Sequence, residues 1–219
     1  RPAVSATAPA PTGGGGDVVL SQPARHVREL RPDAPAGAVA LTLDDGPHPT
    51  WTPRMLDVLR THQVLATFCL VGDQARAHPA LVRAIVAAGH SLCNHTMTHP
   101  QPFSRRPRAQ LHAEIAAAQQ AIVAAGGRSP RLFRAPGGDW SPDVLAVADE
   151  LGLTPLGWDV DPRDWSRPGE ETIVRALSAA RAGDILLSHD GGGDRSQTIA
   201  ALDRVLPALQ ARGCVFVAL

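Results

Sequence analysis

Two adjacent carboxylates behind an apolar run are the side chains in this sequence best suited to chemistry. Residues 38–43 predict a buried strand, and Asp44 and Asp45 follow it before Gly46-Pro47 ends the run. Two ionised carboxylates at a buried strand end are costly unless a positive group compensates them. We expect a metal ion there, with one carboxylate on the ion and the other acting on a bound water. An ordinary turn is the alternative, since Asp-Gly-Pro is favourable turn chemistry.

His95 and His99, four residues apart, supply further side chains of the kind that bind metals. Within one helical turn this spacing places both imidazoles on one face. With Asp45 they form a set of two imidazoles and one carboxylate, which leaves coordination positions open, as catalytic zinc sites do. Because neighbouring side chains on a strand point oppositely, we expect Asp45 on the metal and Asp44 facing the water. Surface or capping histidines are the alternative interpretation.

Short apolar strands and helices that could position these residues alternate along the chain. We expect strands at 38–43, 66–71, 91–93, 132–133, 154–158, 184–188 and 214–218, and helices at 53–62, 79–88, 108–125, 143–151, 171–180 and 198–210. Repeated strand–helix units predict parallel strands with helices outside. About seven such units in one domain of this size favour a closed or nearly closed α/β barrel over an open sheet. No G-x-G-x-x-G follows the first strand, which weakens a dinucleotide-binding interpretation.

The distinctive polar residues cluster behind the predicted strands, where barrels place their working side chains. They are Asp44 and Asp45 after the first strand, His95 and His99 after the third, Arg134 after the fourth, Asp161 and Asp164 after the fifth, and His189 and Asp190 after the sixth. Polar residues without a common role would scatter over helices and both strand ends. The pattern predicts one polar site at the C-terminal end of the barrel.

Composition bounds the organisation and the partners of the chain. Its 219 residues, 44% hydrophobic, suffice for one sizeable core. Equal numbers of basic and acidic residues, 21 each, argue against nucleic acid, and no apolar stretch approaches the about 20 residues of a membrane span. We predict a flexible Ala/Pro/Gly-rich tail or linker over residues 1–36 and a catalytic domain over 37–219.

Two further expectations concern the compartment. The chain has no starting Met, from which we expect a processed or truncated chain and a secreted or cell-wall-associated protein. Cys69 and Cys93 could lie on neighbouring strands, so a disulfide between them is one interpretation. Buried reduced thiols are the other.

Five motifs in order resemble those of the polysaccharide deacetylases of carbohydrate esterase family 4, the NodB-homology domain. They are TLDDGP at 42–47, HTMTH at 95–99, RAPGG at 134–138, DPRDW at 161–165 and LSHD at 187–190. The resemblance covers residues 38–219 and implies a distorted (β/α) barrel with about seven parallel strands. It also implies a metal-dependent hydrolase that removes N-acetyl groups from chitin oligosaccharides or from the N-acetylglucosamine of peptidoglycan.

The resemblance assigns the base and the metal. It implies that Asp44 is the general base and that Arg134 pairs with it and keeps it ionised. It implies that Asp45, His95 and His99 bind the divalent metal. Zinc is the expected ion from the ligand types, and Co²⁺ or Ni²⁺ would fit the same ligands.

The resemblance also assigns the acid and the acetyl pocket. It implies that His189 is the general acid, oriented and tuned by Asp164. The backbone N–H of Gly137 would stabilise the oxyanion, while Trp165 and Leu187 would wall the space for the acetyl methyl. Many relatives carry an aromatic residue where this chain has Gly137, so sugar stacking must fall to other rings. The phenylalanines and all four tryptophans are open to this role, namely Trp51, Trp140, Trp158 and Trp165. We favour Trp165 and Trp140 because they lie beside motif residues, while core packing is the alternative for each ring.

Three other functions are weighed against this interpretation. A glycosidase needs two facing carboxylates, and Asp44 and Asp45 are expected to point apart. An O-deacetylase of acetylated xylan could use the same site. A non-catalytic carbohydrate-binding relative is disfavoured because every catalytic position is filled. Acetate release separates the binding protein from both enzymes, and the choice of amide or ester substrate separates the two enzymes.

Overall fold

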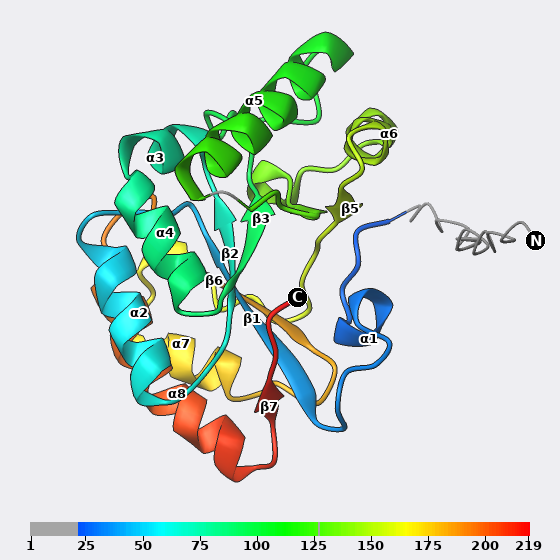
Figure 1. The fold of residues 1–219 in the computed structure, drawn as a ribbon. Coiled ribbons are helices and arrows are strands. Elements are labelled where there is room, and N and C mark those ends of the chain that lie inside the picture. Colours follow the sequence, from blue (N-terminus) through cyan, green and yellow to red (C-terminus); the bar gives the residue numbers. More distant parts are fainter. Residues whose placement is uncertain (1–21, 127) are drawn as a thin grey trace, which may run out of the picture.

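The computed structural model describes residues 22–126 and 128–219 of the chain. Seven parallel strands form one curled sheet in the order β5-β4-β3-β2-β1-β6, with β7 paired to β1 (Figure 1). The strands are β1 (Ala38–Asp44), β2 (Thr67–Leu70), β3 (Ser91–Asn94), β4 (Leu132–Phe133), β5 (Thr154–Pro155), β6 (Ile185–His189) and β7 (Val215–Phe216). The expected distorted (β/α) barrel with about seven parallel strands is confirmed.

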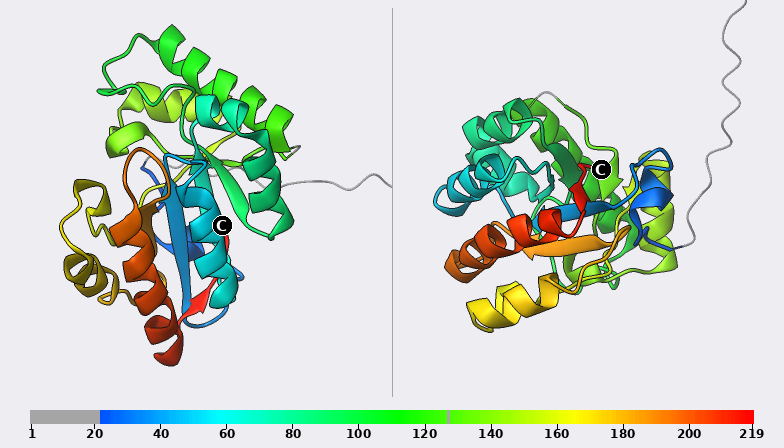
Figure 2. Two further views of the ribbon diagram at one scale, coloured as in Figure 1. Left: turned by 90° about the vertical axis from the view of Figure 1, so that its left-hand side faces the viewer. Right: turned by 90° about the horizontal axis from the view of Figure 1, so that it is seen from below.

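Helices surround the strands, as the view from below in Figure 2 shows. They are α1 (Val27–Leu30), α2 (Trp51–Thr61), α3 (Gly72–Ala77), α4 (Pro79–Ala87), α5 (Arg108–Gly126), α6 (Pro142–Glu150), α7 (Glu170–Leu177) and α8 (Ser196–Ala211). Among the described residues, no helix is long and apolar enough to cross a membrane. The largest hydrophobic cluster fills the space between the sheet and α2, α4, α7 and α8.

Strand β1 lies at the centre of this arrangement, and all seven of its residues are buried. It pairs with β2, β6 and β7, so three neighbours fix its position. The register with β6 places Asp44 opposite His189. Two residues predicted to work together therefore leave the sheet at the same level.

The barrel is closed between β5 and β6 by irregular chain rather than by a full ladder. Val160 bridges to Leu186, and the amide of Leu187 donates to the carbonyl of Val160 at 2.9 Å. Beside β5, the amide of Ala24 donates to the carbonyl of Pro155 and its carbonyl accepts from the amide of Gly157.

The segment 22–36, which contains Ala24 and α1, is therefore part of the fold. Ala24 and Val27 are fully buried, and the amide of Val27 donates to the carbonyl of Gly183 at 2.8 Å. The expectation of a flexible tail to residue 36 is wrong for this segment, because its few apolar residues fill the gap beside β5 and β6. The rest of that expectation falls on residues 1–21, outside the described residues.

The expected elements are found with shifted ends, and two helices were not expected. The expected strands 154–158 and 214–218 shorten to two residues each, and α1 and α3 are additional. Cys69 and Cys93 are register partners on β2 and β3, yet their thiols are free. The interpretation as buried reduced thiols therefore describes this structure, and burial raises the pKa of the Cys69 thiol well above its usual value.

Candidate active site

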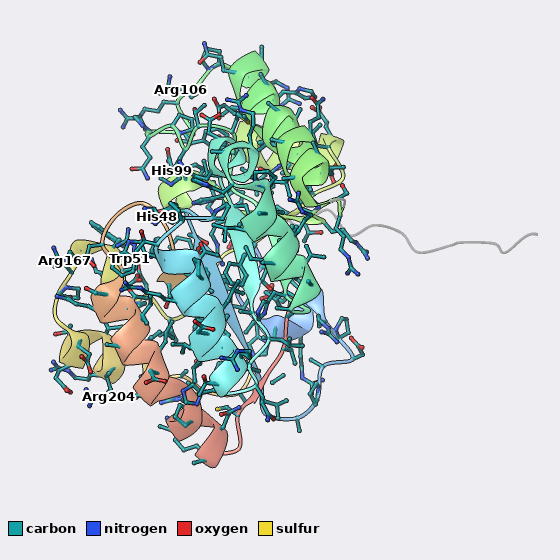
Figure 3. The ribbon with its side chains drawn as sticks, turned by 60° about the vertical axis from the view of Figure 1, so that its left-hand side comes forward. His48, Trp51, His99, Arg106, Arg167 and Arg204 are labelled. Carbon is teal, nitrogen blue, oxygen red and sulfur yellow. The ribbon has the colours of Figure 1, made fainter. Side chains whose placement is uncertain are left out.

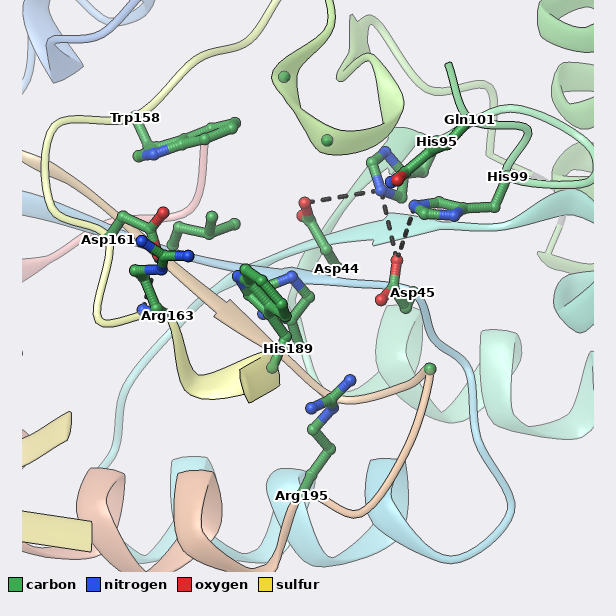
Figure 4. Close-up of a pocket in the computed structure, with 15 residues that line it drawn as sticks. Asp44, Asp45, His95, His99, Gln101, Trp158, Asp161, Arg163, His189 and Arg195 are labelled. Carbon is green, nitrogen blue, oxygen red and sulfur yellow. Dashed lines mark hydrogen bonds and ion pairs between the residues drawn. The ribbon is translucent and has the colours of Figure 1, made fainter. Parts of the chain in front are cut away.

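A cavity of about 590 Å³ opens at the C-terminal ends of the strands (Figure 4). Eight of the ten predicted site residues line it: Asp44, Asp45, His95, His99, Gly137, Trp165, Leu187 and His189. The other two, Arg134 and Asp164, lie buried behind it, each bonded to one of the eight. The argument from strand ends thus predicted that the carboxylates and histidines meet, while Gly137, Trp165 and Leu187 were predicted from the family resemblance alone.

Asp45, His95 and His99 form a compact group of potential metal ligands, with one donor atom from each all within 4.8 Å of one another. Oδ1 of Asp45 lies 3.4 Å from Nε2 of His95 and 3.3 Å from Nε2 of His99. That oxygen is buried and accepts no hydrogen bond from the described residues. An orphaned buried carboxylate oxygen beside two imidazole nitrogens fits a divalent cation.

The orientation of His95 is set by a backbone contact. Its Nδ1 lies 2.8 Å from the carbonyl oxygen of Arg134, which can only accept, so Nδ1 carries the proton and Nε2 is left free. Burial disfavours the charged ring, but the carboxylates of Asp44 and Asp45 outweigh this and raise the pKa of His95. For His99 burial prevails, and its pKa lies below the usual value.

The local structure of the histidine pair differs from the expected helical turn. Residues 95–99 form an irregular loop in which Thr96 and His99 have positive φ, 68° and 54°. The side chain of Asn94 accepts from the amide of Thr96, and Glu114 on α5 accepts from the amide and the hydroxyl of Thr98. Side-chain bonds to the backbone therefore hold the loop, and the imidazoles converge without a helix.

The two carboxylates also differ from expectation. Strand β1 ends at Asp44, and Asp45 has a φ of 72°. The left-handed turn breaks the alternation of a strand, so both side chains face the same cavity, as Figure 4 shows. Nε2 of His95 lies 3.6 Å from Asp44 and 3.4 Å from Asp45. The expectation that they point apart is wrong, while a division of roles between them remains a prediction.

Asp44 is held by a fully buried arginine. Nη1 of Arg134 donates to Oδ1 of Asp44 at 2.7 Å and to the hydroxyl of Thr42 at 2.8 Å. The remaining donors of Arg134 reach the carbonyl oxygens of Leu156 and Gly157. Burial alone would raise the pKa of Asp44, but the guanidinium outweighs it and keeps the pKa below its usual value. Asp44 is therefore ionised at neutral pH and has one oxygen toward the cavity.

His189 is paired with a buried carboxylate in the same manner. Its Nδ1 donates to Oδ1 of Asp164 at 2.7 Å, while Oδ2 of Asp164 accepts from the amide of His189 and the hydroxyl of Thr198. Burial disfavours the imidazolium, but the hydrogen bond and charge of Asp164 outweigh it and raise the pKa of His189. The ring is left with Nε2 as its free nitrogen, and His189 lines the cavity.

The aromatic lining differs in one position from our expectation. Trp165 is half exposed at the cavity, as expected, and Leu187 is buried beside it. Trp140 instead packs edge-on against Phe133 at 5.6 Å between ring centres. Trp158, rather than Trp140, lines the cavity. A Cβ atom on Gly138 would lie only 2.5 Å from the indole ring of Trp158. A glycine at position 138 therefore leaves room for the indole.

Several cavity residues were not favoured for a functional role from the sequence. They are Gln101, Gly138, Trp158, Arg163, Gly192 and Arg195, and Asp161 joins them after being noted only for its place behind the fifth strand. Most lie in loops that follow a strand or a motif, and that position is the one signal that could have found them. Asp190 lies behind the cavity, where burial raises its pKa to about 7 and Thr52 donates to it at 2.5 Å.

The chain is similar to known proteins over most of its length. The family model described as polysaccharide deacetylase matches residues 31–156. The chain is 46% identical to a chitooligosaccharide deacetylase of Sinorhizobium fredii, covering 82% of this chain and 89% of that one. It is 42% identical to a peptidoglycan-N-acetylglucosamine deacetylase of Bacillus cereus, covering 82% and 84%. A family 4 carbohydrate esterase from Streptomyces lividans, solved with acetate, superposes with a TM-score of 0.77 at 38% identity, covering 83% and 91%.

Proposed function

The chain belongs to the polysaccharide deacetylase family, carbohydrate esterase family 4, and from that premise we propose how its own residues perform the reaction. It is a metal-dependent deacetylase that hydrolyses the N-acetyl groups of amino-sugar polymers. The observation that carries the proposal is that two buried pairs lie beside one group of metal ligands. We call these pairs the acid–base units: Asp44 with Arg134, and His189 with Asp164.

Asp45, His95 and His99 would hold the divalent metal, with zinc the ion best suited to two imidazoles and a carboxylate. The bound ion would supply Lewis acidity to the acetyl carbonyl and acidity to the attacking water. Asp44, kept ionised by Arg134, accepts the proton of that water. The N–H of Gly137 at the cavity wall donates to the developing oxyanion.

His189 completes the reaction as the general acid. An amine is a poor leaving group unless it is protonated, and the raised pKa of His189 supplies the proton near neutral pH. Asp164 holds the ring so that Nε2 is the atom that donates. Trp165 and Leu187 enclose the acetyl methyl and keep water from it.

Chitin oligosaccharides and the N-acetylglucosamine of peptidoglycan are the two substrates we propose, since the relatives are named for them. Such a substrate goes with a secreted or cell-wall-associated protein, which remains our expectation for this chain. An O-deacetylase of acetylated xylan is a competing outcome, because an ester is an easier substrate for the same residues.

Acetate release from N-acetylglucosamine oligomers and from acetylated xylan tests the proposal. Each assay would use the protein as purified, after chelation, and after zinc is returned. Release from the amino-sugar oligomers that chelation abolishes and zinc restores is the expected result. Release from xylan alone would replace the amidase with the esterase. No release from either, nor from peptidoglycan, with metal bound would leave a binding protein and overturn the proposal.

A further inference from the structure

One charged residue of the active-site cavity has no part in the mechanism above. Arg195 stands directly before α8 and is only 3% exposed. Its Nε donates to the carbonyl oxygen of Gly191 at 2.6 Å. Among the described residues, neither terminal nitrogen of its guanidinium has a hydrogen-bond or ion-pair partner, and neither is fully buried. Figure 4 shows the side chain extending from the start of α8 toward the cavity beneath His189 and Asp45.

A comparison with Arg134 shows why this is unusual. Both arginines are buried, but Arg134 has the carboxylate of Asp44 and three further acceptors, whereas Arg195 has one carbonyl. Burying a guanidinium without an anion is costly. The hydrogen bond to Gly191 uses only Nε. The two terminal nitrogens face the cavity and have no partner among the described residues. Both terminal nitrogens are therefore placed to bind an anion that enters the cavity.

The acids of the cavity do not supply that anion. Asp44 is bonded to Arg134, Asp45 belongs to the metal ligands, and Asp161 accepts from the backbone amide of Arg163 at 2.7 Å. The nearest acid in sequence, Asp194, pairs with Arg167 at 3.0 Å. A second arginine, Arg163, lines the same cavity with its guanidinium 5.4 Å from the ring centre of Trp165. Although Asp44, Asp45 and Asp161 line the same cavity, no described carboxylate forms an ion pair with Arg163 or Arg195.

We propose that Arg195 binds a carboxylate on a sugar next to the reacting N-acetyl sugar, so that this site favours acidic amino-sugar polymers over neutral ones. The inference rests on the proposed deacetylase function and names a substrate class for the same site. A guanidinium fork matches the two oxygens of a carboxylate. A neutral glycan that covers Arg195 removes water from the guanidinium without replacing it by an opposite charge. An acidic glycan removes the same water but forms an ion pair with the guanidinium.

Three oligosaccharides of equal length and one acetylation pattern test this in the wild-type holoenzyme. The first is a neutral N-acetylglucosamine oligomer. The second alternates N-acetylglucosamine with a sugar that bears an O-lactyl carboxylate, and the third is the second with each carboxylate converted to its methylamide. We expect kcat/KM for the carboxylate to exceed that for the methylamide by about tenfold, as one charge-assisted hydrogen bond can supply. The ratio should fall as salt is added.

Variants assign the preference to Arg195. In Arg195→Gln the ratio of carboxylate to methylamide should fall to about one, and Arg195→Lys should keep part of it. Arg204→Gln is the matched control, since Arg204 on α8 bonds to Glu170 on α7 and lies well away from His48 and His99 in Figure 3. A ratio of rates is used because a merely structural defect lowers both rates together.

The outcomes separate this inference from the proposed function. Equal wild-type rates on carboxylate and methylamide, or a ratio that Arg195→Gln leaves unchanged, would overturn the carboxylate site while acetate release continued. Failure of the proposed function would instead abolish release from all three oligomers. An oligomer with a uronic acid beside N-acetylglucosamine distinguishes the source of the charge. Acceleration by either carboxylate supports the inference, and acceleration by neither overturns it.

Discussion

At the scale of single residues, the two acid–base units show how buried partners define a protonation state. Arg134 keeps Asp44 ionised by holding its pKa low, and Asp164 raises the pKa of His189. Each unit is held by further bonds to backbone or hydroxyl groups, so neither side chain can turn away. The site thereby holds a base and an acid ready at the same pH.

Asp164→Asn tests the acid unit. Removal of the carboxylate charge leaves burial to lower the pKa of His189, so the protonated ring is lost at a lower pH. We expect the alkaline limb of the kcat/KM–pH profile to move to lower pH, with about a hundredfold loss of activity at pH 8. Asp194→Asn removes one charge from the neighbouring loop and serves as the control. An alkaline limb that stays in place would show that His189 does not act as the acid.

Much of this residue-level picture could be predicted from the sequence, because motif and strand-end position select the residue types. The backbone conformation of the site could not be predicted from the sequence. The positive φ of Asp45 and His99 depends on loops that other strands and helices hold. The choice of Trp158 over Trp140 depends on the space that Gly138 leaves, which no local pattern records.

At the scale of elements, the loop after β6 supports the loop after β1. A Cβ on Gly191 would lie 2.1 Å from the carbonyl oxygen of Asp45, and one on Gly192 would lie 2.5 Å from its carboxylate. The amide of Asp190 donates to the carbonyl of Asp44 at 3.1 Å. The backbone at Asp45, a proposed metal ligand, therefore packs directly on Gly191 and Gly192, in the loop between β6 and α8.

Gly191→Ala tests this support, because the added methyl must push Asp45 away from the histidines. We expect at least about tenfold weaker metal binding, the usual effect of a change behind a ligand, with the fold retained. Titration with zinc against a competing chelator measures it. Gly152→Ala is the control, since Gly152 has positive φ but no atom near its Cβ position. It should lose stability yet bind metal as before, and equal affinity in both variants would refute the packing argument.

At the scale of the molecule, the barrel is completed by a segment that composition alone assigned to a tail. Residues 22–36 bond to Pro155, Gly157 and Gly183, across the gap that the sheet leaves. Gly157 in turn gives its carbonyl to Arg134, which holds Asp44. Hydrogen bonds thus connect Ala24, through Gly157 and Arg134, to the proposed general base Asp44. The alternation of strands and helices predicted the barrel but not this closure. The buried residues of the segment, such as Ala24 and Val27, are too few to show the periodicity of a strand or helix.

Val27→Asp tests the contribution of this segment. A buried, unpaired carboxylate in place of Val27 should lower the free energy of unfolding by about 3 kcal/mol or more. Urea unfolding followed by circular dichroism measures it. Arg28→Ala, on the exposed side of the same helix, is the control and should change stability little. Equal unfolding midpoints for the two variants would show that the segment does not support the barrel.

The left-handed backbone of Asp45 also restricts how this protein could change over evolutionary time. Glycine, asparagine and aspartate are the residues that tolerate such a conformation with little strain. Asparagine keeps the shape of the side chain and discards its charge, and one nucleotide separates its codons from those of aspartate. A single inherited change at this position could therefore turn a hydrolase into a sugar-binding protein while the barrel stayed folded, and most other replacements would be removed by selection for the loop itself.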